Sequence, residues 1–277
     1  MINRYETEFS PEFTNRVINC YNRMKFIGVI IMGSFGQGKT SGAMQLGLDI
    51  VNRFYPNKTE DELEEIVLNH MLFTMDEVSN ALFKEIKKVN WDNLSPLDAI
   101  KKQKYIREPF FIWEDAATHG SKHLRNEEVA YEIQKNFDQV RDATSCMIIT
   151  LPEAEEILKV IRTYRSFFRA EPVIQKNNRY MQLVFFKKKR LYSGSLRWTP
   201  SWYSNQRPIR VDDDWYGKYI IMRNKAKIKT DEFWEQKKKF KQQHEEYLRV
   251  KREYLKKKML NEMNEMIGGN NEVDIVE

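Results

Sequence analysis

A glycine-rich octapeptide near the start of the chain has the residue types needed to hold a triphosphate. It satisfies the pattern G-x-x-x-x-G-K-[ST] without a departure and consists of Gly33, Ser34, Phe35, Gly36, Gln37, Gly38, Lys39 and Thr40. In such a loop the backbone N–H groups converge on the phosphates, the lysine reaches the β and γ phosphates, and the hydroxyl of Thr40 is offered to Mg²⁺. The motif therefore predicts ATP and Mg²⁺ as cofactors. The alternative is a glycine-rich turn with an incidental lysine.

Two carboxylates follow a short apolar run in the middle of the chain. Phe110–Trp113 contains four large apolar residues and is followed by Glu114 and Asp115, which is the pattern of a buried strand ending in acids, a Walker B element. In most ASCE-type ATPases the first acid serves the metal and the second polarises the attacking water. We therefore assign Glu114 to Mg²⁺ through its water shell and Asp115 to the nucleophilic water. The reverse assignment and a helix-capping role for the pair stay open.

Further polar residues are candidates for completing this site. Met147–Thr150 has the pattern of another buried strand, and the hydroxyl of its last residue, Thr150, is a candidate sensor of the γ-phosphate. Arginines often neutralise transition-state charge, in many cases from a neighbouring subunit. Arg141 precedes this strand, and Arg162 and Arg165 follow it in a predicted helix, so each is a candidate arginine finger. Each is also a residue type that is commonly solvated at a surface.

The hydrophobic pattern predicts the elements that position these residues. Continuous apolar runs predict buried strands, and apolar spacings of three and four residues predict amphipathic helices. Strands are expected at 26–32, 72–73, 109–113 and 146–149, helices at 39–54, 61–70, 76–88, 126–140 and 153–164, and an insertion with one helix at 90–108. Strands that alternate with helices predict an α/β fold, namely a P-loop NTPase with a parallel sheet flanked by helices.

The pattern changes after residue 170. Short strands expected at 180–186, 190–192 and 195–199 predict a small basic β-hairpin region, and a long C-terminal helix is expected from Thr230. Phe233, Phe240, Tyr247 and Tyr254 recur every seven residues, so this helix either forms a coiled coil or packs back on the parent domain. We expect five parts: an N-terminal segment, a P-loop ATPase core, a basic β-rich extension, the C-terminal helix and a mobile acidic tail, at 1–24, 25–170, 171–229, 230–267 and 268–277.

Charge is distributed unevenly along the chain. The net charge of +6 combines −4 over residues 1–174, +15 over 175–258 and −5 over 259–277. Such a basic segment is either a solvated face or a contact for polyanions such as nucleic acid. No apolar run reaches the ~20 residues of a membrane span, and the N-terminus lacks a secretory signal, so a cytoplasmic protein without membrane contact is expected. The two cysteines, Cys20 and Cys146, cannot supply a disulfide framework, which fits a reducing compartment.

The order of these motifs resembles that of a known family. The chain looks like the DnaA-like P-loop ATPases of archaeal spindle-shaped viruses and plasmids in the succession of Gly33–Thr40, Phe110–Asp115, Val140–Arg141 leading into Met147–Thr150, Val160–Arg162, a basic hairpin and a terminal helix. More distantly, it is similar to AAA+ and FtsK/HerA/Zot-like ASCE ATPases. The similarity spans about residues 25–255 and is specific at the two Walker elements.

This resemblance implies an ATPase of a mobile element that acts on DNA in replication, maintenance or packaging, in the host cytoplasm if the element is viral. It also implies a homo-oligomer such as a ring. No helix-turn-helix or winged-helix module is recognisable, which argues against origin-specific recognition and leaves sequence-nonspecific DNA contact as the expectation.

The basic extension holds the candidate DNA contacts. Lys187, Lys188, Lys189, Arg190 and Arg197 are interleaved with aromatic residues, a combination suited to a backbone groove with base stacking. Alternatively, the aromatic residues form the core of the small sheet and the cations its solvated face. The favoured function is an ATPase whose hydrolysis is coupled to DNA binding or movement. The alternative is a nucleotide-gated adaptor that recruits a protein partner through its C-terminal helix. A third, a small-molecule kinase, leaves the basic extension unexplained.

Overall fold

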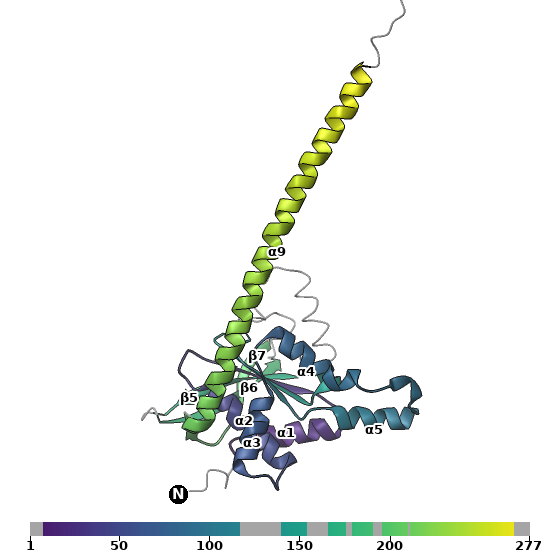
Figure 1. Ribbon diagram of the computed structural model, residues 1–277. Helices are drawn as coiled ribbons and strands as arrows, with labels where there is room; N and C mark the ends of the chain where they lie inside the picture. The colour runs from purple at the N-terminus through teal and green to yellow at the C-terminus, as the bar shows by residue number, and fades with distance from the viewer. Residues whose placement is uncertain are drawn as a thin grey trace, which may run out of the picture. The chain divides into compact units, whose positions relative to one another are not determined.

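A computed structural model of the chain describes residues 8–116, 140–153, 166–175, 179–190, 196–209 and 211–268 (Figure 1). The contacts within the chain divide it into two units, Met1–Arg223 and Asn224–Glu277. The sequence-based boundaries after residues 24 and 170 both fall inside the first unit. The helices expected at 126–140 and 153–164 lie outside the described residues, apart from one end residue of each.

The first unit is built on one mixed sheet. Its parallel strands are β1 (Ile27–Met32), β2 (Met71–Leu72), β3 (Phe111–Trp113), β4 (Cys146–Leu151) and β5 (Phe167–Ile174). The strand order is β2-β3-β4-β1-β5-β6-β7, and pairing is parallel from β2 to β5. β4 therefore lies between the strand that precedes the glycine-rich loop and the strand that precedes the two acids, and the carboxyl ends of these three strands meet at one edge of the sheet. This is the predicted α/β fold of a P-loop NTPase.

Helices flank the parallel strands. They are α1 (Pro11–Asn22), α2 (Lys39–Phe54), α3 (Glu60–Asn69), α4 (Met75–Lys87) and α5 (Pro96–Ile106), with a 3₁₀ turn at Trp91–Asn93. Local signals set where they begin: Thr59 and Glu62 form a capping box at α3, and the Ser95 hydroxyl caps α5. α2 has the predicted bounds, whereas α1 lies in a segment for which the sequence predicts no element.

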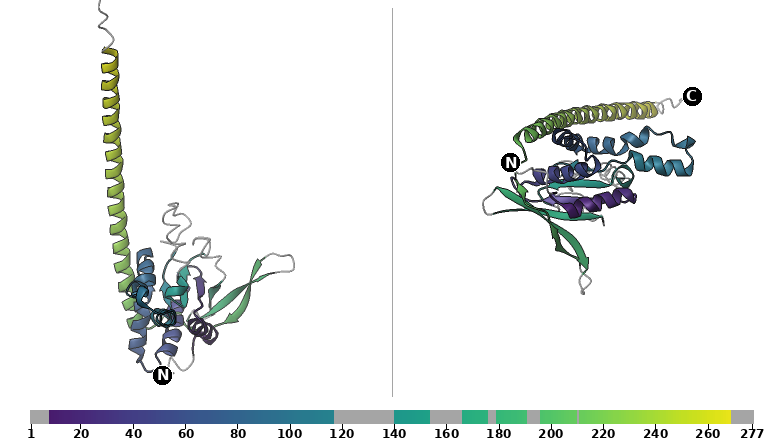
Figure 2. Two further views of the ribbon diagram at one scale, coloured as in Figure 1. Left: turned by 90° about the vertical axis from the view of Figure 1, so that its right-hand side faces the viewer. Right: turned by 90° about the horizontal axis from the view of Figure 1, so that it is seen from below.

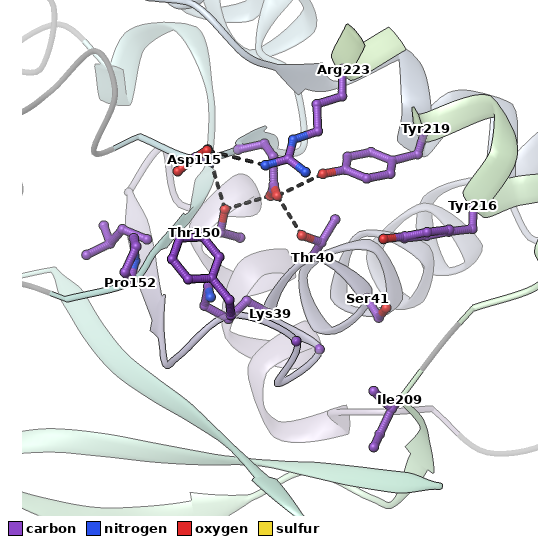
Figure 3. Close-up of a pocket in the computed structure, with 15 residues that line it drawn as sticks. Lys39, Thr40, Ser41, Asp115, Thr150, Pro152, Ile209, Tyr216, Tyr219 and Arg223 are labelled. Carbon is purple, nitrogen blue, oxygen red and sulfur yellow. Dashed lines mark hydrogen bonds and ion pairs between the residues drawn. The ribbon is translucent and has the colours of Figure 1, made fainter. Parts of the chain in front are cut away.

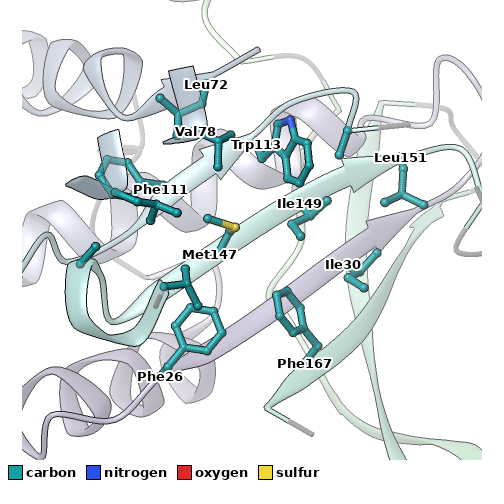
Figure 4. Close-up of a cluster of buried hydrophobic side chains, with 14 of the residues drawn as sticks. Phe26, Ile30, Leu72, Val78, Phe111, Trp113, Met147, Ile149, Leu151 and Phe167 are labelled. Carbon is teal, nitrogen blue, oxygen red and sulfur yellow. The ribbon is translucent and has the colours of Figure 1, made fainter. Parts of the chain in front are cut away.

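Buried side chains from the strands and helices form the core. On one face of the sheet, Trp113 of β3 and Ile149 of β4 belong to a cluster that includes Val78 of α4 (Figure 4). On the other face α2 lies close to β3, because a Cβ at Gly47 would be 3.2 Å from Cδ1 of Ile112. Every residue of β1 and β4 is buried, which explains why both strands are continuous apolar runs in the sequence.

The basic segment continues the central sheet instead of forming a separate one. β5 pairs in parallel with β1 and antiparallel with β6 (Tyr180–Arg190). β6 pairs antiparallel with β7 (Leu196–Tyr203) and, at its other end, with β8 (Arg207–Pro208). The predicted basic hairpin is thus present as β6 and β7, and it projects beyond the helices that cover the parallel strands (Figure 2). β5, for which the sequence predicts no strand, joins the two parts of the sheet.

The last helix, α9, spans Asp213–Gly268 and begins before the predicted start at Thr230. The carboxylate of Asp212 accepts a hydrogen bond from the backbone N–H of Asp214 (2.9 Å), and acidic side chains stabilise a helix N-terminus. The first turns also contribute to the core of the first unit, since Tyr219 is 1% exposed. Burial of this aromatic face explains the earlier start, because the predicted start rested on the seven-residue spacing of aromatic residues further along the chain.

The second unit is helical from Asn224 to Gly268. Of the four aromatic residues that recur every seven positions, Tyr247 (60%) and Tyr254 (65%) are exposed in this unit. The side chains of the other two, Phe233 and Phe240, lie outside the described part of the chain. None of the helices described for either unit combines the length and the apolar character that crossing a membrane requires.

Candidate functional site

The loop between β1 and α2 depends on glycine. Gly36 (φ 78°) and Gly38 (φ 82°) adopt the left-handed conformation, which strains residues with a side chain. At Gly38, which precedes the first turn of α2, a Cβ would also lie 2.7 Å from Sδ of Met181 on β6. The loop therefore passes close to β6. It leads directly into the N-terminus of α2, which carries a positive partial charge and suits the binding of a phosphate.

Lys39 is folded back onto its own loop (Figure 3). Its ammonium donates hydrogen bonds to the carbonyl oxygens of Gly33 (2.6 Å) and Ser34 (2.9 Å), and it lies 5.4 Å from the ring centroid of Phe35. Phe35 is 82% exposed, so this ring forms an outer edge of the loop and not part of the core. The side chain thus places a positive charge inside the glycine-rich loop.

Glu114 is the centre of a hydrogen-bonded cluster. Its Oε1 accepts from the hydroxyls of Thr40 (2.5 Å) and Tyr219 (3.0 Å), and its Oε2 accepts from the hydroxyl of Thr150 (2.6 Å) (Figure 3). The carboxylate is buried, with Glu114 only 4% exposed, and the three hydroxyls take the place of water around it. The cluster joins the end of the glycine-rich loop to the ends of β3 and β4.

Asp115, the next residue, is oriented differently. Its backbone adopts a positive φ of 52°, an uncommon conformation for a residue with a side chain, and its N–H donates to the hydroxyl of Thr150 (3.0 Å). Its carboxylate pairs with the guanidinium of Arg223 at 3.4 Å. The two successive acids therefore face different partners: Glu114 faces hydroxyls, and Asp115 faces a cation.

The oxygen atoms at the loop fit a Mg²⁺ site. Mg²⁺ prefers oxygen ligands and usually keeps several waters, so it needs only one or two protein groups in addition to phosphates. The Thr40 hydroxyl donates a hydrogen bond to Glu114, and the lone pairs of the Thr40 oxygen face a cation at this position when one binds. The arrangement suits direct binding by Thr40 and binding through water by Glu114, and these two roles stay predictions.

These groups line a cavity of about 260 Å³. Besides the glycine-rich loop, the two acids and Thr150, its walls include Ile209, which follows β8, and Tyr216, Tyr219 and Arg223 of α9. Burial, and next the charge of Glu114, raise the pKa of Tyr219 well above that of an exposed tyrosine, so its hydroxyl stays protonated and donates. A chain segment more than 90 residues after the acids in the sequence thus closes the site.

The sequence-based predictions do not include the side of the cavity that α9 forms. Tyr216, Tyr219 and Arg223 recur at three- and four-residue steps, which is a usable signal for one face of a helix. This signal applies only if the helix begins near Asp213, as α9 does, whereas the predicted helix begins at Thr230.

Of the three candidate arginines, the structure describes only Arg141, which does not line this cavity. Arg141 precedes the amino end of β4, its side chain is 65% exposed, and it lies near Asp142 (3.7 Å). It therefore lies away from the carboxyl edge of the sheet, and a role as arginine finger stays a prediction for a neighbouring copy. Arg162 and Arg165 lie outside the described residues.

The basic hairpin carries cations next to an aromatic ring. Lys188 and Arg169 lie over Trp198, with their charged groups 5.1 Å and 4.6 Å from the ring centroid. Lys187 and Arg197 are exposed. For Lys189 and Arg190 only the backbone, in β6, is among the described features.

A second tryptophan on the hairpin has a structural environment. Trp202 stacks on Phe185 (4.7 Å between ring centroids) and meets Phe168 edge to face (5.0 Å), and Arg16 of α1 lies over it at 4.8 Å. The two readings of the hairpin aromatics therefore apply to different residues: Trp202 packs in a small core, and Trp198 lies among cations.

Comparison with known proteins gives distant similarities. No protein-family model matches the chain. Over 152 residues the chain is 24% identical to "Uncharacterized protein B-251" of Sulfolobus spindle-shape virus 1. This match covers 53% of the chain and 51% of the viral protein, so the chain spans about half the length of that relative.

The similar solved structures also have low sequence identity to this chain. Domain III of the replication initiation protein DnaA from Thermotoga maritima is 16% identical, with coverage of 60% of this chain and 64% of that one and a TM-score of 0.31. The N-terminal domain of zonular occludens toxin from Neisseria meningitidis is 13% identical, with coverage of 69% and 97% and a TM-score of 0.32. The fold class, a P-loop NTPase, rests on the strand order and the loop described above.

Proposed function

We propose that this protein is a Mg²⁺-dependent ATPase that acts on the DNA of a virus or plasmid and couples hydrolysis to DNA binding or movement. The hydrogen bond between Thr40 and Glu114 (2.5 Å) is the observation that carries the proposal. It joins the last residue of the glycine-rich loop to the first acid after β3, across the intervening β4, and a hydrated Mg²⁺ bound to a triphosphate requires both groups at one point.

Each residue of the cluster has a role in this proposal. The loop amides of Gly33–Gly38 and the ammonium of Lys39 bind the phosphates, so Lys39 gives up its carbonyl contacts on binding. Thr40 and Glu114 hold the metal, which neutralises charge on the phosphate oxygens. Asp115 accepts a hydrogen bond from the attacking water, and Thr150 fixes both acids through its contacts with Glu114 and the Asp115 N–H.

The DNA contact is assigned to the β6–β7 hairpin. Lys187, Lys188 and Arg197 lie on it, and Trp198 is positioned among cations, an arrangement that suits phosphate contact with base stacking. The similarity to a protein of a spindle-shaped virus supports a mobile element as the source of the DNA. Contact mainly with phosphates would be sequence-nonspecific.

One set of measurements tests the proposal. ATP turnover is measured with and without single- and double-stranded DNA, and molecular mass is measured with and without ATP. Turnover that rises with DNA supports a DNA-coupled ATPase, and a rise in mass with ATP supports a homo-oligomer such as a ring. Absence of ATP turnover with and without DNA contradicts the enzymatic part of the proposal.

A nucleotide-gated adaptor is the second candidate function. The second unit favours it, because a helix that exposes Tyr247, Val250 and Tyr254 offers an apolar surface to a protein partner. DNA-stimulated turnover of the full chain favours the ATPase, whereas a chain truncated after Asn224 that keeps DNA binding but loses assembly favours the adaptor.

A further inference from the structure

One face of the first turns of α9 contacts both acids of the site. Tyr219 and Arg223 are four residues apart, so they lie on the same face of the helix. The Tyr219 hydroxyl donates to Glu114 (3.0 Å), and the Arg223 guanidinium pairs with Asp115 (3.4 Å) (Figure 3). Two adjacent acids at the end of β3 are therefore held by two side chains from a single helix face.

The surroundings of Tyr219 fix where its hydroxyl lies. Its side chain is 1% exposed, and its ring centroid is 6.1 Å from that of Phe73 and 5.4 Å from that of Tyr216. A ring packed on two sides has little freedom, so the hydroxyl is a preorganised donor to Glu114. It shares the acceptor oxygen Oε1 with Thr40, and so the two hydroxyls together set the direction of that oxygen.

Arg223 has the corresponding effect on Asp115. The backbone of Asp115 is held by β3 and by Thr150, but its carboxylate is part-exposed, with 35% of the side chain accessible. A short side chain that must meet a water in line with a phosphate tolerates little displacement, since an error of about 1 Å costs on the order of 100-fold in rate. The contact with Arg223 restricts the carboxylate to one side of the cavity.

We infer that Tyr219 and Arg223 are positioning residues: Tyr219 orients Glu114 toward the metal position, and Arg223 orients Asp115 toward the attacking water. This inference rests on the proposed ATPase function. It differs from an arginine that binds phosphate, because Arg223 acts through Asp115 and its loss leaves nucleotide affinity unchanged.

Kinetics test the role of Arg223. Arg223→Gln is expected to lower kcat about tenfold with the KM for ATP unchanged, and Arg223→Lys is expected to restore part of the loss. Affinities for ATP and ADP, measured by calorimetry, are expected to match those of the wild type. Weaker binding of ATP with ADP binding retained would show that Arg223 contacts the γ-phosphate, and it would overturn the inference.

Stability without nucleotide tests the same pair independently. The unfolding midpoints of Asp115→Asn, Arg223→Gln and the double variant form a cycle, and the two single effects are expected not to add. Additive effects overturn the pairing. Absence of nucleotide binding by the wild type would instead overturn the proposed function and the catalytic consequence, while this cycle would still decide whether the pair exists.

Tyr219→Phe tests the other contact and keeps the packed ring. The Mg²⁺ concentration for half-maximal turnover is expected to rise about tenfold, because only the hydroxyl that orients Glu114 is lost. The matched control is Lys218→Gln, on the exposed side of the same helix turn, which is expected to leave kcat, KM and the Mg²⁺ requirement unchanged. An unchanged Mg²⁺ requirement in Tyr219→Phe would overturn the role of Tyr219.

Discussion

The two adjacent acids, Glu114 and Asp115, have different partners. Glu114 is buried and accepts hydrogen bonds from three hydroxyls, one of them from Thr40. Asp115 is part-exposed and paired with Arg223. A buried carboxylate beside Thr40 suits a metal held through water, and a carboxylate at the open side of the cavity suits contact with a water, which supports the assignment of Glu114 to the metal and Asp115 to the nucleophile.

Replacing the two acids separately tests this division. Asp115→Asn is expected to lower kcat by on the order of 100-fold while ATP binding is retained, because only the acceptor for the attacking water is weakened. Glu114→Gln is expected to raise the Mg²⁺ requirement. Steady-state turnover at several Mg²⁺ concentrations distinguishes the two. Trapped ATP with slow turnover from Glu114→Gln alone would reverse the assignments.

Lys39 is the second residue-level test. Lys39→Ala removes the cation inside the glycine-rich loop, and ATP affinity measured by calorimetry is expected to fall about 100-fold, since hydrogen bonds between charged groups are the strong ones. Lys101→Ala, on the exposed surface of α5, is the control and is expected to leave affinity unchanged. Retained ATP affinity in Lys39→Ala would contradict the proposed site.

At the scale of elements, a buried acid on α2 forms hydrogen bonds with the residues that precede α1. The carboxylate of Asp49 on α2 accepts hydrogen bonds from the N–H groups of Phe9 (3.0 Å) and Ser10 (2.7 Å), just before α1 begins. On the other side, Phe13 stacks on Phe185 of β6 (5.6 Å between centroids). α1 therefore links the parallel sheet to the hairpin, and it belongs to the core of the first unit.

This acid predicts a pH dependence. Burial raises the pKa of Asp49 to about 7, against the two N–H groups that lower it. Because the folded chain then binds the proton more tightly than the unfolded chain, the contribution of Asp49 to stability is full below about pH 4 and is lost as the pH rises to about 7. The slope is at most about 1.4 kcal/mol per pH unit for this one group.

The measurement compares wild type with Asp49→Asn, which does not titrate and keeps one of the two acceptor oxygens for the N–H groups of Phe9 and Ser10. The free energy of unfolding is obtained with denaturant at pH 4.5 and at pH 7.5. The difference between the two proteins is expected to shift in favour of the variant at the higher pH. A difference that is independent of pH would show that Asp49 does not titrate in this window.

The hairpin gives a second prediction at this scale. Replacing Lys187 and Lys188 by Gln is expected to weaken DNA binding and to reduce the slope of log K against log salt by about one per lost phosphate contact. Binding is measured between low and physiological salt on DNA of unrelated sequences. Lys101→Gln is the control. A flat salt response of the wild type would count against the hairpin as a phosphate contact.

At the scale of the whole chain, the two units carry different properties. The first unit, Met1–Arg223, contains the complete cavity, including the first turns of α9. The second unit is a helix with exposed Tyr247 and Tyr254. The residues that we propose to bind ATP and Mg²⁺ thus lie within one unit, and the proposed assembly through the helix is a separate property.

Truncation tests this separation. A chain that ends at Asn224 is expected to bind ATP with the affinity of the full chain, since every described residue of the cavity is retained. The number of subunits per particle in the presence of ATP, which is the measured mass divided by the mass of one chain, is expected to be lower than for the full chain if the helix mediates assembly. Calorimetry and light scattering measure the two properties. Loss of ATP binding would show that the site depends on residues after Asn224.

The sequence by itself indicated four of the five parallel strands that the structure describes, β1 to β4, and the residue types at their edge. Strands buried on both faces must be continuous apolar runs, so β1 and β4 are visible without coordinates. The glycine-rich loop is equally explicit, because backbone convergence on phosphate requires those glycines at that spacing. The proximity of Thr40 and Glu114 follows from these two patterns. The glycine-rich loop follows β1 and Glu114 follows β3, and the carboxyl ends of parallel strands lie at the same edge of the sheet.

Tertiary structure alone decided how the later part of the chain completes the site. β5 is not a continuous apolar run, and its role as a bridge between parallel and antiparallel strands depends on pairing with β1, which is far away in the sequence, as well as with β6. The contacts of Tyr219 and Arg223 with the acids join residues more than 100 positions apart. A local pattern marks these residues as one face of a helix, but it does not say which part of the chain that face contacts, because the contact depends on what the fold brings alongside.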